Sequence, residues 1–196
     1  MDIEKLSNKL RFRIIKMSHE TKAPHLGSSL SCIDIVATLY ESVLRIKFKN
    51  PKWELRDRFI LSKGHGAAAL FQILAMRGFY SEELLNDYGQ DGSIFAEHPP
   101  APDYLPGIEA ATGSLGHGLP IGLGMALASR ITDNPYHVYV LLGDGECNEG
   151  SIWEAANMAS AQSMDNLTVF IDANKWQATD RSIDLLGNPS HVDKSL

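Results

Sequence analysis

Residues 137–174 read HVYVLLGDGECNEGSIWEAANMASAQSMDNLTVFIDAN, and this stretch decides the fold. Residues 137–142 and 167–172 are short apolar runs that predict two buried strands, and residues 151–163 predict a helix. A strand, a helix and a second strand in this order imply a parallel pair, because the helix carries the chain back to the end of the sheet where it started. The sequence therefore predicts the α/β fold class, with a parallel sheet flanked by helices.

Polar residues follow both predicted strands. Gly143-Asp144-Gly145 comes directly after the first strand, and Asn174 closely follows the second. Ligands of open α/β sheets bind beyond the carboxyl ends of the strands, where a close backbone approach and the next helix N-terminus favour a phosphate. The oxygens of Asp144 and Asn174 are hard donors that suit Mg²⁺ or Ca²⁺. We therefore predict a site for a metal-bound phosphate; the alternative is a tight Asp-Gly turn beside an ordinary loop asparagine.

The rest of the chain predicts the other elements of a single domain, residues 1–196. Further elements are expected as helices at 2–18, 31–46 (with Ser31 as N-cap), 67–76 and 116–130, a short helix capped by Ser81, and a strand at 58–62. Residues 88–114 are rich in Gly and Pro and predict a long irregular segment, which is either functional or disordered. Beyond Asp180 the periodicity is lost and no closing strand is evident, so the C-terminal part of the domain is expected to be missing.

Composition narrows the class of protein. Apolar residues make up 44% of the 196 residues, enough for a substantial core. The net charge is −6 and no block of Lys or Arg stands out, which argues against nucleic-acid and anionic-membrane partners. Cys32 and Cys147 are far apart, no signal peptide precedes the first helix, and no apolar run reaches the ~20 residues of a membrane helix. A reduced, cytoplasmic protein is expected.

Several motifs together resemble the N-terminal, diphosphate-binding domain of transketolase. Gly143-Asp144-Gly145, followed after residues 146–173 by Asn174, resembles the thiamine-diphosphate fingerprint. The other matching motifs are PHLG at 24–27, LSKGHG at 61–66, EHP at 97–99, GSLGHG at 113–118 and GDGECNEG at 143–150. This resemblance spans most of the chain and implies the thiamine-diphosphate-binding fold.

The resemblance also implies two cofactors, thiamine diphosphate and Mg²⁺, for which Ca²⁺ or Mn²⁺ can substitute. It assigns the metal to the side chains of Asp144 and Asn174 and to the backbone carbonyl of Trp176. The residues that it assigns to the cofactor are His65, Gly113, Leu115, Gly143, Asp144, Gly145, Glu146 and Asn174.

Four residues take catalytic roles by the same resemblance. His25 and His98 line the channel to the reactive carbon, where they can hydrogen-bond the hydroxyls of the donor and assist proton transfers. Glu149 and Glu154 match paired interface acids that link the two active sites of a dimer. The alternatives are structural roles: His25 as a hydrogen-bonded loop residue, and the two glutamates as ordinary charged residues in the first turn of a helix.

The implied activity is transfer of a two-carbon ketol unit from a ketose phosphate to an aldose phosphate. The chain lacks the pyrimidine-binding domain, whose glutamate activates the cofactor in this family. We therefore expect one of two explanations. Either a separate partner chain, the C-terminal transketolase subunit, completes a homodimer or heterotetramer, or the sequence is truncated. Two alternatives stay open: another thiamine-diphosphate enzyme (a decarboxylating synthase or an unusual-sugar ketol transferase) and a non-catalytic module with the same fold.

Overall fold

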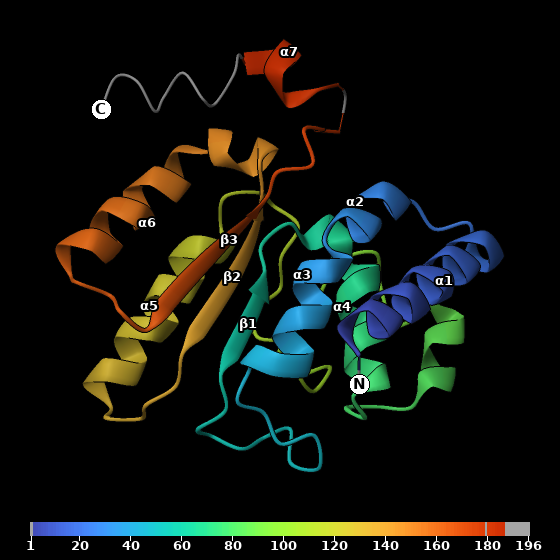
Figure 1. The fold of residues 1–196 in the computed structure, drawn as a ribbon, viewed down its shortest axis with the longest axis horizontal. Coiled ribbons are helices and arrows are strands. Elements are labelled where there is room, and N and C mark those ends of the chain that lie inside the picture. Colours follow the sequence, from blue (N-terminus) through green and yellow to red (C-terminus); the bar gives the residue numbers. More distant parts are fainter. Residues whose placement is uncertain (1, 179, 187–196) are drawn as a thin grey trace.

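A parallel three-stranded sheet forms the centre of the computed structural model, which describes residues 2–178 and 180–186. Its strands are β1 (Arg58–Leu61), β2 (Val138–Gly143) and β3 (Leu167–Asp172), in the order β1-β2-β3. Both pairs are parallel, so the predicted strand–helix–strand unit is confirmed. The central strand β2 is apolar along its whole length because helices cover both of its faces (Figure 1).

Helices flank the sheet on both sides, as predicted. One layer contains α1 (Ile3–Thr21), α2 (Leu26–Ser31), α3 (Ile33–Thr38) and α4 (Ala67–Met76), and the other contains α5 (Gly118–Ile131) and α6 (Gly150–Ala161) (Figure 1). Side chains alternate along β2, so that Leu141 packs with the α1–α4 layer, whereas Val140 and Leu142 pack with the α5–α6 layer. Each face of the sheet therefore has its own hydrophobic core.

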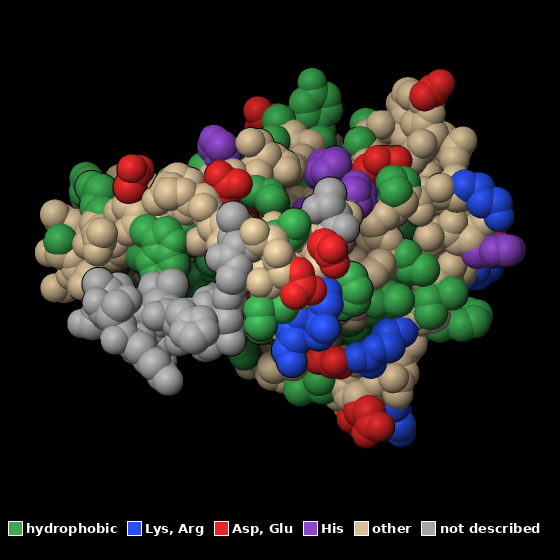
Figure 2. All heavy atoms as spheres, turned by 90° about the horizontal axis from the view of Figure 1, so that it is seen from above, with side chains coloured by type: hydrophobic (Ala, Val, Ile, Leu, Met, Phe, Trp, Pro, Cys, Tyr) green, Lys and Arg blue, Asp and Glu red, His purple; other side chains and the backbone are tan. Residues whose placement is uncertain are grey.

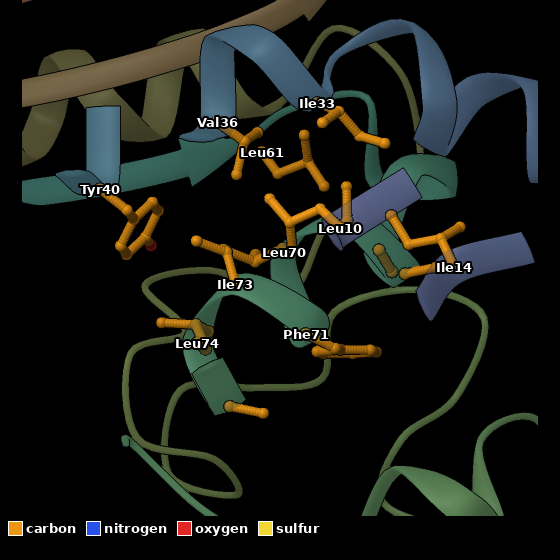
Figure 3. Close-up of a cluster of buried hydrophobic side chains, with 14 of the residues drawn as sticks. Leu10, Ile14, Ile33, Val36, Tyr40, Leu61, Leu70, Phe71, Ile73 and Leu74 are labelled. Carbon is orange, nitrogen blue, oxygen red and sulfur yellow. The ribbon is translucent and has the colours of Figure 1, made fainter. Parts of the chain in front are cut away.

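The larger core lies under α1 (Figure 3). Leu6, Leu10, Ile14 and Met17 recur at helical spacing and are all buried. Figure 3 shows Leu10 and Ile14 pointing toward side chains of α3, α4 and β1. The Asp2 side chain accepts a hydrogen bond from the Glu4 N–H and so caps the helix. The predicted helix at 2–18 is confirmed, and it continues to Thr21.

The segment 26–43 differs from the single helix predicted at 31–46. The helix begins earlier, at Leu26, is interrupted at Cys32, resumes as α3 and ends in a π-helical turn, Leu39–Val43. Ser31 is therefore the last residue of α2 and not an N-cap. Its hydroxyl donates to Asp172 Oδ2 at 2.6 Å, a contact across the whole fold that no local pattern reveals.

The remaining short elements are three 3₁₀ turns and one helix: Gly64–Gly66, Glu82–Asp87, Gly145–Asn148 and α7 (Ser182–Leu186). The turn at Glu82–Asp87 stands where a short helix after Ser81 was predicted, and α7 stands where no periodic element was expected. None of the helices that the structure describes is long and apolar enough to cross a membrane.

The long irregular segment predicted at 88–114 is ordered. Its own side chains Tyr88, Phe95, Leu105 and Ile108 are buried in the larger core. Phe71 of α4 makes edge-on ring contacts with Tyr88 and Phe95, at centroid distances of 6.1 and 5.4 Å. Because the segment is fixed by its own core residues, it can hold the residues that follow it in one position.

Close packing of α5 on the sheet gives a stability prediction with a matched control. A Cβ on Gly122 would lie 2.5 Å from Val140 Cγ2, whereas a Cβ on Gly124 would meet nothing within 4 Å. Gly124→Ala should stabilise the chain by about 0.5–1 kcal/mol through helix propensity. Gly122→Ala should instead destabilise it, because overpacking costs about 1–3 kcal/mol. Urea unfolding of both variants measures the difference; equal stabilisation by the two would contradict this packing.

Candidate functional site

The two predicted polar strand ends meet at one edge of the sheet. Gly143 pairs with Asp172, and the Asp144 N–H donates to the Asp172 carbonyl at 3.2 Å. The loop after β3 folds back onto Asp144, whose Oδ2 accepts from the Lys175 N–H at 3.1 Å and from Ser182 Oγ at 2.9 Å. The spatial prediction made from strand order is therefore confirmed.

The second carboxylate oxygen of Asp144 makes neither of these contacts. This oxygen, Oδ1, is buried and has no hydrogen-bond partner among the residues that the structure describes. An unpaired buried carboxylate oxygen is costly unless a cation or a donor reaches it. Asn174 lies in the adjoining loop, where its Oδ1 accepts from the Trp176 N–H at 2.7 Å and keeps a second lone pair. These residues fit a hard cation.

A cation here would need oxygens from outside the side chains. Within the described part of the chain, no group of three or more His, Cys, Asp or Glu gathers as a ready metal cluster. One carboxylate, one amide and one backbone carbonyl make an incomplete shell for Mg²⁺, which prefers six oxygens and often shares phosphate groups. The donor set is therefore one that an anionic phosphate ligand would complete.

The helix predicted at 151–163 is confirmed as α6, Gly150–Ala161. A 3₁₀ turn, Gly145–Asn148, follows the strand, and α6 begins only at Gly150, so the α-helix N-terminus does not directly follow Gly143-Asp144-Gly145. A Cβ on Gly145 would lie 2.5 Å from Gln177 Cγ. The turn and the loop after β3 thus pack directly on each other.

Glu146 joins three of the sequence motifs. Its side chain is buried, and its carboxylate accepts hydrogen bonds from Ser62 Oγ, from the Gly116 N–H at 2.8 Å and from the Gly143 N–H at 3.3 Å. The predicted contact of Glu146 with a cofactor stays a prediction. What the contacts establish is an anchor that holds the 61–66, 113–118 and 143–150 motifs in one arrangement.

Three histidines from different motifs come together beside this anchor. The ring of His25 lies 5.8 Å from that of His65 and 5.6 Å from that of His98, between centroids. Figure 2, which looks onto the strand ends, shows histidine side chains gathered near the middle of this face. Gly113 supports His98 closely, because a Cβ there would lie 2.9 Å from His98 Cδ2 and the φ of +153° favours glycine.

The electrostatics of this cluster keep His65 neutral at pH 7. Burial lowers the pKa of His65 to about 4, and the positive charges of Lys63, His25 and His98 act in the same direction. Burial also lowers the pKa of His98, with a smaller contribution from His25. Both rings are therefore available as neutral donors and acceptors of hydrogen bonds.

Comparison with known proteins identifies the family. Residues 3–185 match the family model "Transketolase, thiamine diphosphate binding domain". The chain belongs to this family. One apulose-4-phosphate transketolase subunit, from Phocaeicola vulgatus, is 41% identical over 98% of this chain and 68% of its own length. The subunit SqwG of a 6-deoxy-6-sulfo-D-fructose transketolase from Clostridium sp. (strain MSTE9) is 38% identical over 90% of this chain and 64% of its own length.

Solved structures agree with this membership. The transketolase from Leishmania mexicana superimposes with a TM-score of 0.90 and 29% identity, over 98% of this chain and 30% of that one. Transketolase from Campylobacter jejuni gives a TM-score of 0.88 at 31% identity. The chain thus spans about two thirds of the related subunits and under a third of these two transketolase chains. The predicted thiamine-diphosphate-binding fold is confirmed.

The remaining predicted site residues of this transketolase-family chain lie at the edge of the site. Leu115 is half-buried in the turn that ends at Gly116, and the Gly116 carbonyl accepts from Ser151 Oγ at 2.7 Å. Glu149 and Glu154 are exposed at the N-terminal end of α6, and Glu149 makes no capping hydrogen bond with its side chain. Their interface role stays a prediction.

The sequence did not single out several residues that build the site. Lys63 and Asp172 form a buried ion pair of 2.6 Å, and Ser31 and Ser182 contribute hydroxyls. Lys63 stands inside the 61–66 motif, which was a usable signal, whereas Ser31 has no sequence signal. His137 lies at the other end of the sheet, where its Nε2 is 2.8 Å from Thr168 Oγ1, and His191 lies outside the described residues.

The role of Glu146 as an anchor is testable by a nearly isosteric change. Glu146→Gln turns one acceptor oxygen into a donor, so buried donors of the three motifs lose their partner. We expect destabilisation by about 1–3 kcal/mol, measured by urea unfolding. Glu154→Gln on the exposed face of α6 is the control and should stay within about 0.5 kcal/mol. Equal effects of the two changes would refute the anchor.

Burial of neutral His65 predicts a pH dependence of stability. Its folded pKa of about 4 lies below the ordinary value of 6.5. Its contribution is therefore complete above pH 6.5 and is lost as the pH falls toward 4, because the unfolded chain then binds the proton more tightly. As the pH falls from 7 to 5, the free energy of unfolding of His65→Gln should decrease less than that of the wild type. His19→Gln, on the exposed surface of α1, should keep the wild-type slope; identical slopes for all three proteins would contradict the burial argument.

Proposed function

We propose that this chain binds thiamine diphosphate and Mg²⁺ and serves as the diphosphate-binding subunit of a two-component transketolase. In this proposal the enzyme transfers a two-carbon ketol unit between sugar phosphates. The buried Oδ1 of Asp144, which has no partner among the residues that the structure describes, carries the proposal, because it lies beside the loop of Asn174 in a site that needs phosphate oxygens to complete a cation shell. Membership in the thiamine-diphosphate-binding family supports the identity of the phosphate ligand.

Each site residue has a definite task in this proposal. Asp144 and Asn174, with the carbonyl of Trp176, would hold the cation, and Gly145 would let the backbone approach the diphosphate. Neutral His65 would hydrogen-bond a phosphate oxygen without placing a second charge beside the cation. When bound, thiamine diphosphate supplies the carbon nucleophile that the chemistry needs, and His25 and His98 would bind the donor hydroxyls and move protons there.

An uncovered surface supports the need for a partner protein. Val169 and Ile171 of β3 pair with Val140 and Leu142, so they face the α5–α6 side, yet they are 38% and 53% exposed. Trp153 and Met158 of α6 are exposed as well, each at 49%. Exposed apolar side chains on a sheet face and on the helix of the same layer are suited to contact with a partner protein. We assign this surface to the pyrimidine-binding subunit, because the two relatives compared above are themselves named as transketolase subunits.

A second candidate keeps the cofactor and changes the sugar. The two related subunits are named for apulose 4-phosphate and for 6-deoxy-6-sulfo-D-fructose. A panel of ketose donors and aldose acceptors, assayed with the reconstituted pair of subunits, distinguishes the usual sugar phosphates from such unusual substrates.

The metal and cofactor assignment predicts the effect of Asp144→Asn. The change keeps the shape of the side chain and removes its charge, so affinity for thiamine diphosphate with Mg²⁺ should fall at least about tenfold, since hydrogen bonds and contacts to charged groups contribute about 1.5–3 kcal/mol. Calorimetry of the chain with its pyrimidine-binding subunit measures this. Asp133→Asn, at an exposed turn after α5, is the control and should bind like the wild type.

The same preparations test the activity. The pair of subunits should transfer the ketol unit, the Asp144→Asn pair should not, and this chain alone should show no turnover. Full activity of this chain alone, or wild-type affinity in Asp144→Asn, would overturn the proposed function.

A further inference from the structure

A buried ion pair stands directly behind the proposed metal site. Lys63 is fully buried, and its Nζ lies 2.6 Å from Asp172 Oδ2 and donates to Ser31 Oγ at 3.2 Å. The Ser31 hydroxyl donates to the same Asp172 oxygen at 2.6 Å, and Asn174 Nδ2 lies 3.5 Å from it. Segments from the end of α2, from the turn after β1 and from the end of β3 thus converge on one carboxylate oxygen.

Stability does not account for this pair. Removing two charges from water is costly, and buried ion pairs replaced by apolar residues of similar size are often neutral or more stable. Direct contact of Lys63 with a phosphate does not account for it either, since the ammonium is fully buried and already has two hydrogen-bonding partners. The remaining explanation is that Lys63 and Asp172 orient neighbouring groups.

The neighbouring group that matters is a second carboxylate. Asp144 and Asp172 lie at the carboxyl ends of adjacent strands, and both offer hard oxygens that suit a divalent cation. Asp144 Oδ1 is buried and has no hydrogen-bond partner among the residues that the structure describes, whereas Asp172 Oδ2 is paired with Lys63 Nζ. A positive charge at Lys63 disfavours a cation at Asp172 and so leaves Asp144 as the carboxylate ligand.

The orientation of Asn174 follows from the same pair. Its amide nitrogen lies 3.5 Å from both Asp172 Oδ2 and Ser31 Oγ, and the carboxylate accepts hydrogen bonds but cannot donate them. The amide oxygen therefore points the other way, where it already accepts from the Trp176 N–H. Such indirect partners of a ligand set its orientation and commonly change metal affinity about 10–100-fold.

We propose that Lys63 is a positioning residue of the metal site: it neutralises Asp172, keeps that carboxylate out of the coordination shell and thereby turns the Asn174 oxygen toward the cation. This role rests on the proposed binding of a divalent cation with thiamine diphosphate. It adds two residues, Lys63 and Asp172, that act on the metal without touching it.

The test uses Mn²⁺ as the probe, and its free concentration is read by electron paramagnetic resonance. The complex of the chain with its pyrimidine-binding subunit is titrated with and without thiamine diphosphate. In the wild type, tight Mn²⁺ binding should need the diphosphate. In Lys63→Met the Asp172 carboxylate is no longer paired. Without the diphosphate, Mn²⁺ should therefore bind this variant about tenfold more tightly than it binds the wild type. With the diphosphate, Mn²⁺ should bind the variant about tenfold more weakly than the wild type.

A double variant separates positioning from structural support. Lys63→Met/Asp172→Asn removes both charges and keeps an acceptor for Asn174, so Mn²⁺ binding with and without diphosphate should return to within about threefold of the wild type. If Lys63→Met does not fold because it buries an unpaired carboxylate, the double variant still decides the matter. Its failure to restore diphosphate-dependent binding would overturn the positioning role and favour direct contact of Lys63 with the cofactor.

Two further outcomes separate a failure of this inference from a failure of the proposed function. Wild-type Mn²⁺ affinities in a folded Lys63→Met, with only the melting temperature lowered, would show a structural role and overturn the inference while leaving the proposed function intact. Absence of diphosphate-dependent Mn²⁺ binding in the wild type would overturn the proposed function and the inference together.

Discussion

The parallel pairing of β2 with β3 is the constraint on which the rest of the site depends. Because Gly143 lies opposite Asp172, the polar residues that follow both strands must share one edge of the sheet. Asp144 then lies beside the loop of Asn174, and one of its oxygens stays buried without a partner among the described residues. A shift of one residue in this register would turn the side chains of β3 to the opposite face and separate the two groups.

The charged groups at this edge of the sheet bear on what Asp144 Oδ1 can bind. Lys63 balances Asp172, whereas Asp144 Oδ1 has no partner among the described residues. On the other side of the site, His65 is kept neutral by burial and by neighbouring positive charge. A single divalent cation with an anionic diphosphate fits this arrangement, because Asp144 and the phosphate oxygens would share the cation.

The sequence predicted the parts of the fold that have local signatures. Apolar runs revealed β2 and β3, and helical spacing revealed α1, because burial of one face leaves a period in the sequence. It missed the break at Cys32 and also the position of Ser31, whose hydroxyl contacts Asp172, far away along the chain. The gathering of the three histidines followed only from family motifs, because the ordered segment 88–114 that contains His98 has no periodicity.

Direct observation of the cation is the decisive measurement. Crystals of the chain with its pyrimidine-binding subunit, grown with thiamine diphosphate and Mn²⁺, would give an anomalous difference peak at the metal. The account predicts a peak bonded to Asp144 Oδ1 and Asn174 Oδ1 at about 2.0–2.3 Å, with Asp172 still paired with Lys63. A peak bonded to Asp172, or no peak at the strand ends when the cofactor is bound, would contradict it.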